Sequence, residues 1–152
     1  MFTAREVIGI AIQIEENGER FYRQAIEVAN KAEMQDLLKW LADEEARHGK
    51  FFIDMKDSIV QKTGDDWAVQ ISEQLLQSMV KDRAFSLEEV RFAAIETDAQ
   101  LIEVGLELER DSIQFYELLL SFIDDPETVV HVNEILKEEK RHMDFLKKRL
   151  SA

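Results

Sequence analysis

Glu45-Ala46-Arg47-His48 recurs 94 residues later in the chain as Glu139-Lys140-Arg141-His142. The recurrence extends beyond these motifs, because the stretches 6–30 and 40–54 share nine identities with the residues 94 positions further on. Most other matched positions keep only their apolar character. A repeat at one fixed offset predicts a duplicated structural unit, here a pair of helices.

Length and composition indicate one all-α domain over residues 1–152. A chain of this size buries roughly 68–70% of its unfolded surface, which is enough for a real core. It has one proline and five glycines, and it is rich in Glu, Leu, Ile, Ala, Lys and Gln. These residues lose little side-chain freedom in a helix, so long helices are expected.

The net charge of -13 narrows the possible partners. Nucleic acid and anionic membranes would be repelled, so we expect neither as a partner, whereas cations would be attracted. No apolar run approaches the roughly 20 residues of a membrane-spanning helix, and residues 1–15 do not resemble a signal peptide, so a cytoplasmic protein is expected. The chain has no cysteine, and any bound metal must therefore have oxygen and imidazole ligands.

Apolar residues at three- and four-residue steps predict four long helices. The expected ranges are 4–29, 32–62, 97–123 and 126–150. The first connection is so short that its two helices must be antiparallel neighbours. Thr97 with Gln100, and Asp125 followed by Pro126, are start signals for the third and fourth helices. The internal duplication then covers 4–62 and 97–150.

The remaining segment, 63–96, is the long crossover between helices 2 and 3. Asp65-Asp66 can cap a short helix over 67–81, and Ser86 with Glu89 makes a capping box for another. Four long helices with one long crossover are the arrangement of a ferritin-like bundle.

Six side chains on these helices form a pattern that is typical of a site for two metal ions. In Glu-x-x-His the carboxylate and the imidazole lie on one helix face, so both can reach the same ion. A glutamate from each of two helices, with Glu-x-x-His from each of the other two, is the di-iron or di-manganese carboxylate pattern. The predicted metal ligands are Glu15, Glu45, His48, Glu109, Glu139 and His142.

Charge supports this assignment. Four carboxylates on apolar helix faces would repel one another and lose hydration, which costs several kcal/mol per ion. Two divalent cations would cancel the four negative charges. The alternative is that both motifs arise by chance in a chain with 32 acidic residues. We favour a centre of two Fe ions, with Mn possible, because both motifs are in register with the apolar stripe and with the repeat.

Two tyrosines lie close to the predicted ligands along the helices. Tyr22 and Tyr116 follow Glu15 and Glu109 by seven residues and face the same core. Each hydroxyl either donates a hydrogen bond to a ligand carboxylate, and so supports the catalytic chemistry, or belongs to an ordinary buried aromatic residue.

Five other residues of interest are not expected to bind metal. Glu44 and Glu138 repeat but lie one position off the apolar stripe, so surface or interface roles are expected. Gly18 and Ser112 either leave room for a small molecule or allow close helix packing. His131 has no histidine at its repeat position, and we do not expect it to bind metal.

The order and spacing of the six ligands resemble those of the rubrerythrin group of the ferritin-like superfamily. The run Asp111-Ser112-Ile113-Gln114-Phe115-Tyr116 is similar to small rubrerythrin-related proteins. The resemblance covers nearly the whole chain. It implies a four-helix bundle, a non-haem di-iron site, a homodimer, and redox chemistry with peroxide or dioxygen.

The chain departs from that group in two ways. Rubrerythrins proper usually add a rubredoxin domain whose four cysteines hold an electron-delivering iron, and this chain has no cysteine. They also carry an additional glutamate one turn along the third helix. Here Leu106 and Ser112 lie one turn from Glu109, and Glu103 is almost two turns away.

Three functions fit these observations. The leading hypothesis is a di-iron oxidoreductase, bridged by Glu45 and Glu139, that reacts with peroxide or dioxygen and receives electrons from an external donor such as a rubredoxin-like protein. The second is an Fe(II)-binding or ferroxidase-type protein that handles iron for storage. The third is a structural bundle that the metals stabilise.

Overall fold

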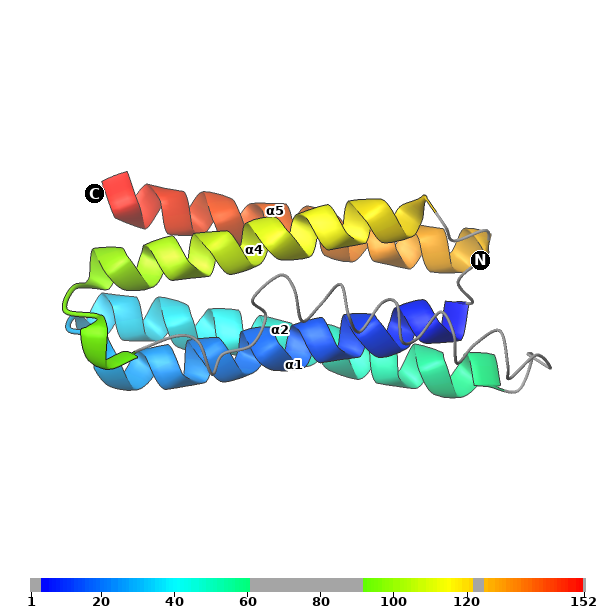
Figure 1. Ribbon diagram of the computed structural model, residues 1–152, viewed down its shortest axis with the longest axis horizontal. Helices are drawn as coiled ribbons and strands as arrows, with labels where there is room; N and C mark the ends of the chain where they lie inside the picture. The colour runs from blue at the N-terminus through cyan, green and yellow to red at the C-terminus, as the bar shows by residue number, and fades with distance from the viewer. Residues whose placement is uncertain (1–3, 61–91, 122–124, 152) are drawn as a thin grey trace.

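The computed structural model describes residues 4–60, 92–121 and 125–151. Within them lie the helices α1 (Ala4–Val28), α2 (Ala32–Val60), the short 3-10 helix η2 (Phe92–Ala94), α4 (Asp98–Leu120) and α5 (Pro126–Ser151). Figure 1 shows two antiparallel hairpins, α1 with α2 and α4 with α5, stacked as two layers. The predicted all-α four-helix bundle is confirmed.

The direction of the helices explains why a long connection is needed. Helices α2 and α4 run the same way, so α2 ends at the opposite end of the bundle from η2 and the start of α4 (Figure 1). A bundle with this order requires one long crossover. The short helix predicted over 67–81, and the capping box of Ser86 and Glu89 predicted to start another, lie outside the described residues.

Capping groups set where α4 and α5 begin. Thr97 Oγ1 accepts a hydrogen bond from the backbone N–H of Gln100 at 3.2 Å, and the side chain of Gln100 accepts one from the backbone N–H of Thr97 at 3.1 Å. This capping box satisfies two donors that the helix leaves free. Asp125 accepts from the backbone N–H of Thr128 at 3.0 Å, and Pro126 takes the first helical position. Both starts were predicted from the sequence.

The end of α4 differs from the sequence-based expectation. The helix ends at Leu120 rather than near residue 123. The backbone N–H and the hydroxyl of Ser121 both donate to the carbonyl of Leu118, which closes the last turn. The structure describes α2 as far as Val60. The predicted end of this helix at residue 62 lies outside the described residues.

One polar contact ties the two hairpins together at the end of the bundle. The carboxylate of Asp98 accepts hydrogen bonds from the backbone N–H groups of Asn30 and Lys31, at 2.7 and 3.1 Å. It thereby joins the turn between α1 and α2 to the first residue of α4. The position of each hairpin along the other is fixed by this contact as well as by the core.

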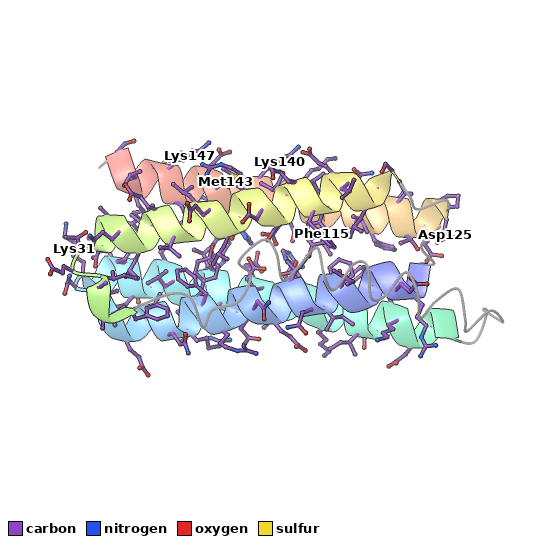
Figure 2. All side chains as sticks on the ribbon, viewed as in Figure 1. Lys31, Phe115, Asp125, Lys140, Met143 and Lys147 are labelled. Carbon is purple, nitrogen blue, oxygen red and sulfur yellow. The ribbon has the colours of Figure 1, made fainter. Side chains whose placement is uncertain are left out.

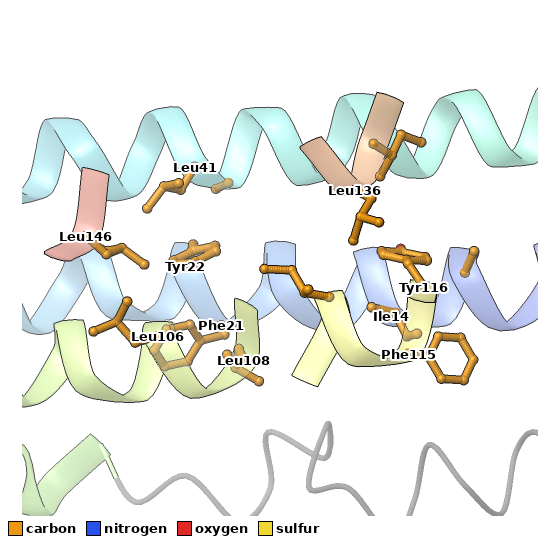
Figure 3. Packing of buried hydrophobic residues seen from close by; sticks show 14 of the residues in the cluster. Ile14, Phe21, Tyr22, Leu41, Leu106, Leu108, Phe115, Tyr116, Leu136 and Leu146 are labelled. Carbon is orange, nitrogen blue, oxygen red and sulfur yellow. The ribbon is translucent and has the colours of Figure 1, made fainter. Parts of the chain in front are cut away.

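Apolar residues from all four long helices form one core. Figure 3 shows Tyr22 and Tyr116 within it, with Leu41 and Leu146 near Tyr22. Helix α4 can approach Tyr22 closely because residue 105 is glycine, where a Cβ would meet the tyrosine Cε1 at 3.5 Å and Leu146 at 3.3 Å. No helix in the described ranges is long and apolar enough to cross a bilayer.

Candidate metal centre

Carboxylates and imidazoles from all four long helices meet in the middle of this core. They form two groups whose ligand atoms lie within 4.8 Å of one another. Glu45 on α2 and Glu139 on α5 belong to both groups. The first group adds Glu15 and His48, and the second adds Glu109 and His142. The structure thus brings together all six side chains that the repeat singled out.

Burial makes this cluster unusual. Each of the six residues is at most 4% exposed. Several of their polar atoms have no hydrogen-bond partner among the described residues: Glu15 Oε2, Glu109 Oε2, Glu139 Oε2 and both ring nitrogens of His142. Buried polar atoms normally have partners, and buried charges are paired or coordinate metals. The donor set of four carboxylates and two imidazoles therefore fits two divalent cations.

The carboxylates perturb one another strongly. Burial, followed by the charges of Glu139, Glu15 and Glu109, raises the pKa of Glu45 well above its ordinary value. Burial and the charge of Glu139 raise the pKa of Glu109 to about 8. Burial and the charge of Glu15 oppose ionisation of Glu139, but its contacts with Glu109 and with both histidines outweigh them and lower its pKa. Without cations, the cluster therefore keeps protons at neutral pH.

The two imidazoles are held among these carboxylates. Nδ1 of His48 lies 3.0 Å from Glu139 Oε1 and 3.5 Å from Glu15 Oε2. Burial alone would lower the pKa of His48, but Glu139 and Glu15 outweigh burial and raise it to about 11. His142 is similar, since Glu109 and Glu139 overcome burial and raise its pKa to about 10. Both Nδ1 atoms face the cluster.

Each of the two tyrosines donates a hydrogen bond to a glutamate in the other half of the repeat. Tyr22 on α1 donates a 2.6 Å hydrogen bond to Glu109 on α4, and Tyr116 on α4 donates one of 2.6 Å to Glu15 on α1. Burial first, and then the charge of the bonded glutamate, raises the pKa of each tyrosine well above its ordinary value, so both remain donors. Of the two interpretations made from the sequence, the hydrogen bond to a candidate ligand is the one observed.

Glu138 has a role that the sequence analysis missed. It lies beside the cluster, where it accepts hydrogen bonds from His48 Nε2 and from Arg47 Nη2, the latter at 2.6 Å. These bonds outweigh burial and lower its pKa. A carboxylate on the outer nitrogen of a metal-binding histidine fixes the orientation of the ring. The signal was present in the sequence, because Glu138 repeats and precedes a ligand, but its position off the apolar stripe argued for a surface role.

The repeat partner of Glu138 behaves differently. Glu44 bonds Arg47 within α2, at 2.9 Å from its Nε, and this bond is the main reason why its pKa is lowered. The outer nitrogen of His142 consequently has no carboxylate partner among the described residues. The two halves of the cluster therefore have the same inner residues and different outer contacts.

The remaining candidates lie to the side of the cluster. A Cβ at Gly18 would meet the Glu45 carboxyl carbon at 3.4 Å, so glycine lets α1 lie close to that carboxylate. Ser112 is buried and donates to the carbonyl of Leu108. His131 is one-third exposed beside Phe51, away from both groups, and Glu103 is exposed.

The chain matches the family model described as Rubrerythrin over residues 6–150. It therefore belongs to the rubrerythrin family, although its 152 residues contain no cysteine and hence no rubredoxin iron site. Among solved structures it is similar to a hypothetical protein from Pyrococcus furiosus, with 17% identity, a TM-score of 0.67, and coverage of 98% of this chain and 89% of that one. That likeness supports the fold. No curated protein matches the chain.

Protein treated with a chelator should become less stable as the pH rises from about 6 to about 9. Glu109, His142 and His48 have folded-state pKa values of about 8, 10 and 11, all above their ordinary values. Between these pH values the folded chain holds protons that the unfolded chain has released, so the stability that they contribute is lost as the pH rises toward the folded-state values. The urea midpoint at the two pH values measures the effect.

Saturation with Mn(II) is the control for this experiment. The metal takes the place of protons on the same atoms, so the fall in stability should be smaller. A midpoint of the chelated protein that rises with pH would contradict the proton assignment.

Substitutions at the repeat pair Glu138 and Glu44 should have unequal effects on metal binding. Glu138→Gln removes the acceptor charge on the outer nitrogen of His48 and should weaken one metal site by about 10–100-fold. Glu44→Gln is the matched control, because Glu44 bonds an arginine rather than a histidine. Titration with Co(II), followed by visible absorption, measures both. Equal losses in the two variants would show that the outer contacts are equivalent after all.

Proposed function

We propose that this member of the rubrerythrin family is a non-haem di-iron redox protein that reduces peroxide or reacts with dioxygen, using electrons from a separate donor. The observation that carries the proposal is the sharing of Glu45 and Glu139 between two buried ligand groups. A shared carboxylate can bridge two ions, and two redox-active ions handle two electrons together. Family membership supports the same class of chemistry.

The proposed ligands are the six clustered residues, with Glu15 and His48 on one ion, Glu109 and His142 on the other, and Glu45 and Glu139 between them. Carboxylate and imidazole ligands suit iron and manganese, and the chain has no thiolate that would favour softer metals. Two bound iron ions would supply the two electrons that convert one peroxide into two waters. Four carboxylates would neutralise two divalent ions, which explains why so much charge can be buried.

The chain's own residues would prepare this chemistry in three ways. Burial of the ligands excludes bulk water, so their charges act on the metals with little screening. Tyr22 and Tyr116 hold Glu109 and Glu15 by hydrogen bonds and fix their orientation. Glu138 does the same for His48. We assign the tyrosines as positioning residues, because their phenolic protons are held firmly on the hydroxyl groups.

An external donor is needed because the chain has no internal relay. Reduction of peroxide consumes two electrons and two protons and yields two waters. No cysteine is present to hold a second redox centre. A rubredoxin-like electron carrier is the kind of partner that would complete the cycle.

The purified protein should bind about two Fe(II) or Mn(II) ions per chain. His142→Ala should lower the metal content, because it removes one of six clustered ligands. His131→Ala is the matched control on the same helix and should leave the content unchanged, because that histidine lies outside both groups. Elemental analysis gives the stoichiometry. An equal loss of metal in the two variants would overturn the ligand assignment.

Reduced di-iron protein mixed with peroxide should oxidise rapidly, stop after one turnover, and cycle only when an electron donor is added. Stopped-flow spectra with peroxide and with dioxygen, together with a size measurement, test this. The alternative Fe(II)-handling function predicts faster oxidation by dioxygen, continued uptake of Fe(II), and a large hollow assembly. A metal-stabilised structural bundle predicts no reaction with either oxidant.

A further inference from the structure

Trp40 connects the candidate metal centre with solvent. This α2 residue is 39% exposed, yet its ring centroid lies 5.3 Å from that of His142, with the planes at 76°. His142 itself is 1% exposed. One side chain therefore contacts both the surroundings of the protein and a proposed metal ligand.

Within the part of the chain that the structure describes, no exposed aromatic side chain contacts His48 in the same way. The position equivalent to Trp40 is the exposed residue Glu134, and the outer nitrogen of His48 is bonded to Glu138. Among the described residues, Trp40 is the exposed aromatic side chain that touches an imidazole of the cluster. The surroundings of His142 and His48 therefore differ at the protein surface as well as in their hydrogen bonds.

Trp40 lies in a small aromatic patch with a basic edge. Its ring packs edge-on against Phe145 of α5, at 5.3 Å and 89°, and Phe145 is 37% exposed. Lys148 Nζ lies 5.9 Å from the centroid of the Phe145 ring. We call Trp40, Phe145 and Lys148 the Trp40 patch.

The helix that carries this edge differs in charge from the rest of the chain. Helix α5 has six Lys or Arg against five Asp or Glu, whereas the whole chain has 19 against 32. Lys140 and Lys147 project from its outer side (Figure 2). An acidic partner would therefore meet less repulsion at α5 than elsewhere on the molecule.

We propose that the Trp40 patch is the docking surface for the electron donor, a small one-electron carrier with an acidic surface, and that electrons reach the metals through Trp40 and His142. This inference rests on the proposed function. Two donor molecules are each oxidised by one electron, the metal pair is reduced by two, and no bond forms or breaks at Trp40. The protons consumed later end in the water formed from peroxide.

The small size of the patch, its aromatic composition and its basic edge favour a small acidic electron carrier as its partner. Transient redox encounters bury little surface, and aromatic residues are enriched where such contacts are fully covered. A basic edge accelerates association with an acidic carrier. A second copy of this chain is less suited, because a two-fold contact would bring the same basic edge against itself.

Binding can be measured without turnover. In a Trp67→Phe background Trp40 is the only tryptophan, and its fluorescence should change when an acidic rubredoxin is added to chelator-treated protein. Basic cytochrome c is the control and should give no saturable change at the same ionic strength. Lys148→Glu should weaken rubredoxin binding and its dependence on salt. No saturable binding of rubredoxin, or binding unaffected by Lys148→Glu, would overturn the docking surface.

The electron route needs a second measurement on iron-loaded protein. Trp40→Leu should slow reduction by rubredoxin at least about tenfold, while Trp40→Phe should retain most of the rate. Reduction by methyl viologen, which needs no docking surface, should be the same in Lys148→Glu as in the wild-type protein, because Lys148 contacts Phe145 and not the cluster. Metal content is checked in parallel, so that a loss of iron is not mistaken for a slow transfer.

The outcomes separate the two proposals. If methyl viologen cannot reduce the wild-type centre, the redox function fails whatever rubredoxin does. If it can, and Trp40→Leu leaves the rubredoxin rate unchanged, the electron route is wrong. Conversion of a wild-type dimer to a monomer by Trp40→Leu would identify the patch as a contact between two copies instead.

Discussion

Mutual repulsion among four buried carboxylates is the constraint on which the rest of this structure depends. Glu15, Glu45, Glu109 and Glu139 each come from a different long helix and meet at the centre of the bundle. Bringing them together without compensation would cost several kcal/mol per charge. In the chain itself the compensation comes from two imidazolium groups, two tyrosine hydroxyls and retained protons. The same charges would give two cations a strongly favourable site.

The core is arranged to hold this charge. Tyr22 and Tyr116 belong to the apolar core and also donate to Glu109 and Glu15, so packing and polar satisfaction are achieved by the same rings. Because each tyrosine reaches across to the other hairpin, a disturbance in one half is expected to alter a carboxylate in the other. The fold and the candidate centre are therefore coupled.

The internal duplication accounts for the six clustered residues better than for the side chains that contact the cluster from outside. The six inner residues match pair by pair, whereas Glu138 bonds His48 and Glu44 bonds Arg47. Arg47 donates to both glutamates, and its repeat partner Arg141 is exposed. The two repeated helix pairs thus place chemically different side chains around His48 and His142. Such a difference would let one side of the proposed two-metal centre face the surface through Trp40, while a carboxylate covers the histidine of the other.

The sequence by itself determined the helical class, the starts of α4 and α5, and the six clustered residues, because these depend on local spacing and on the repeat. Tertiary structure alone decided which glutamate each tyrosine meets, since that contact crosses between hairpins. It also decided that Glu138 contacts His48 and that Trp40 contacts His142. Both lie off the apolar stripe, and a helix pattern cannot show what a neighbouring helix brings against an edge position. Contacts between elements, rather than patterns within them, distinguish the two halves of the site.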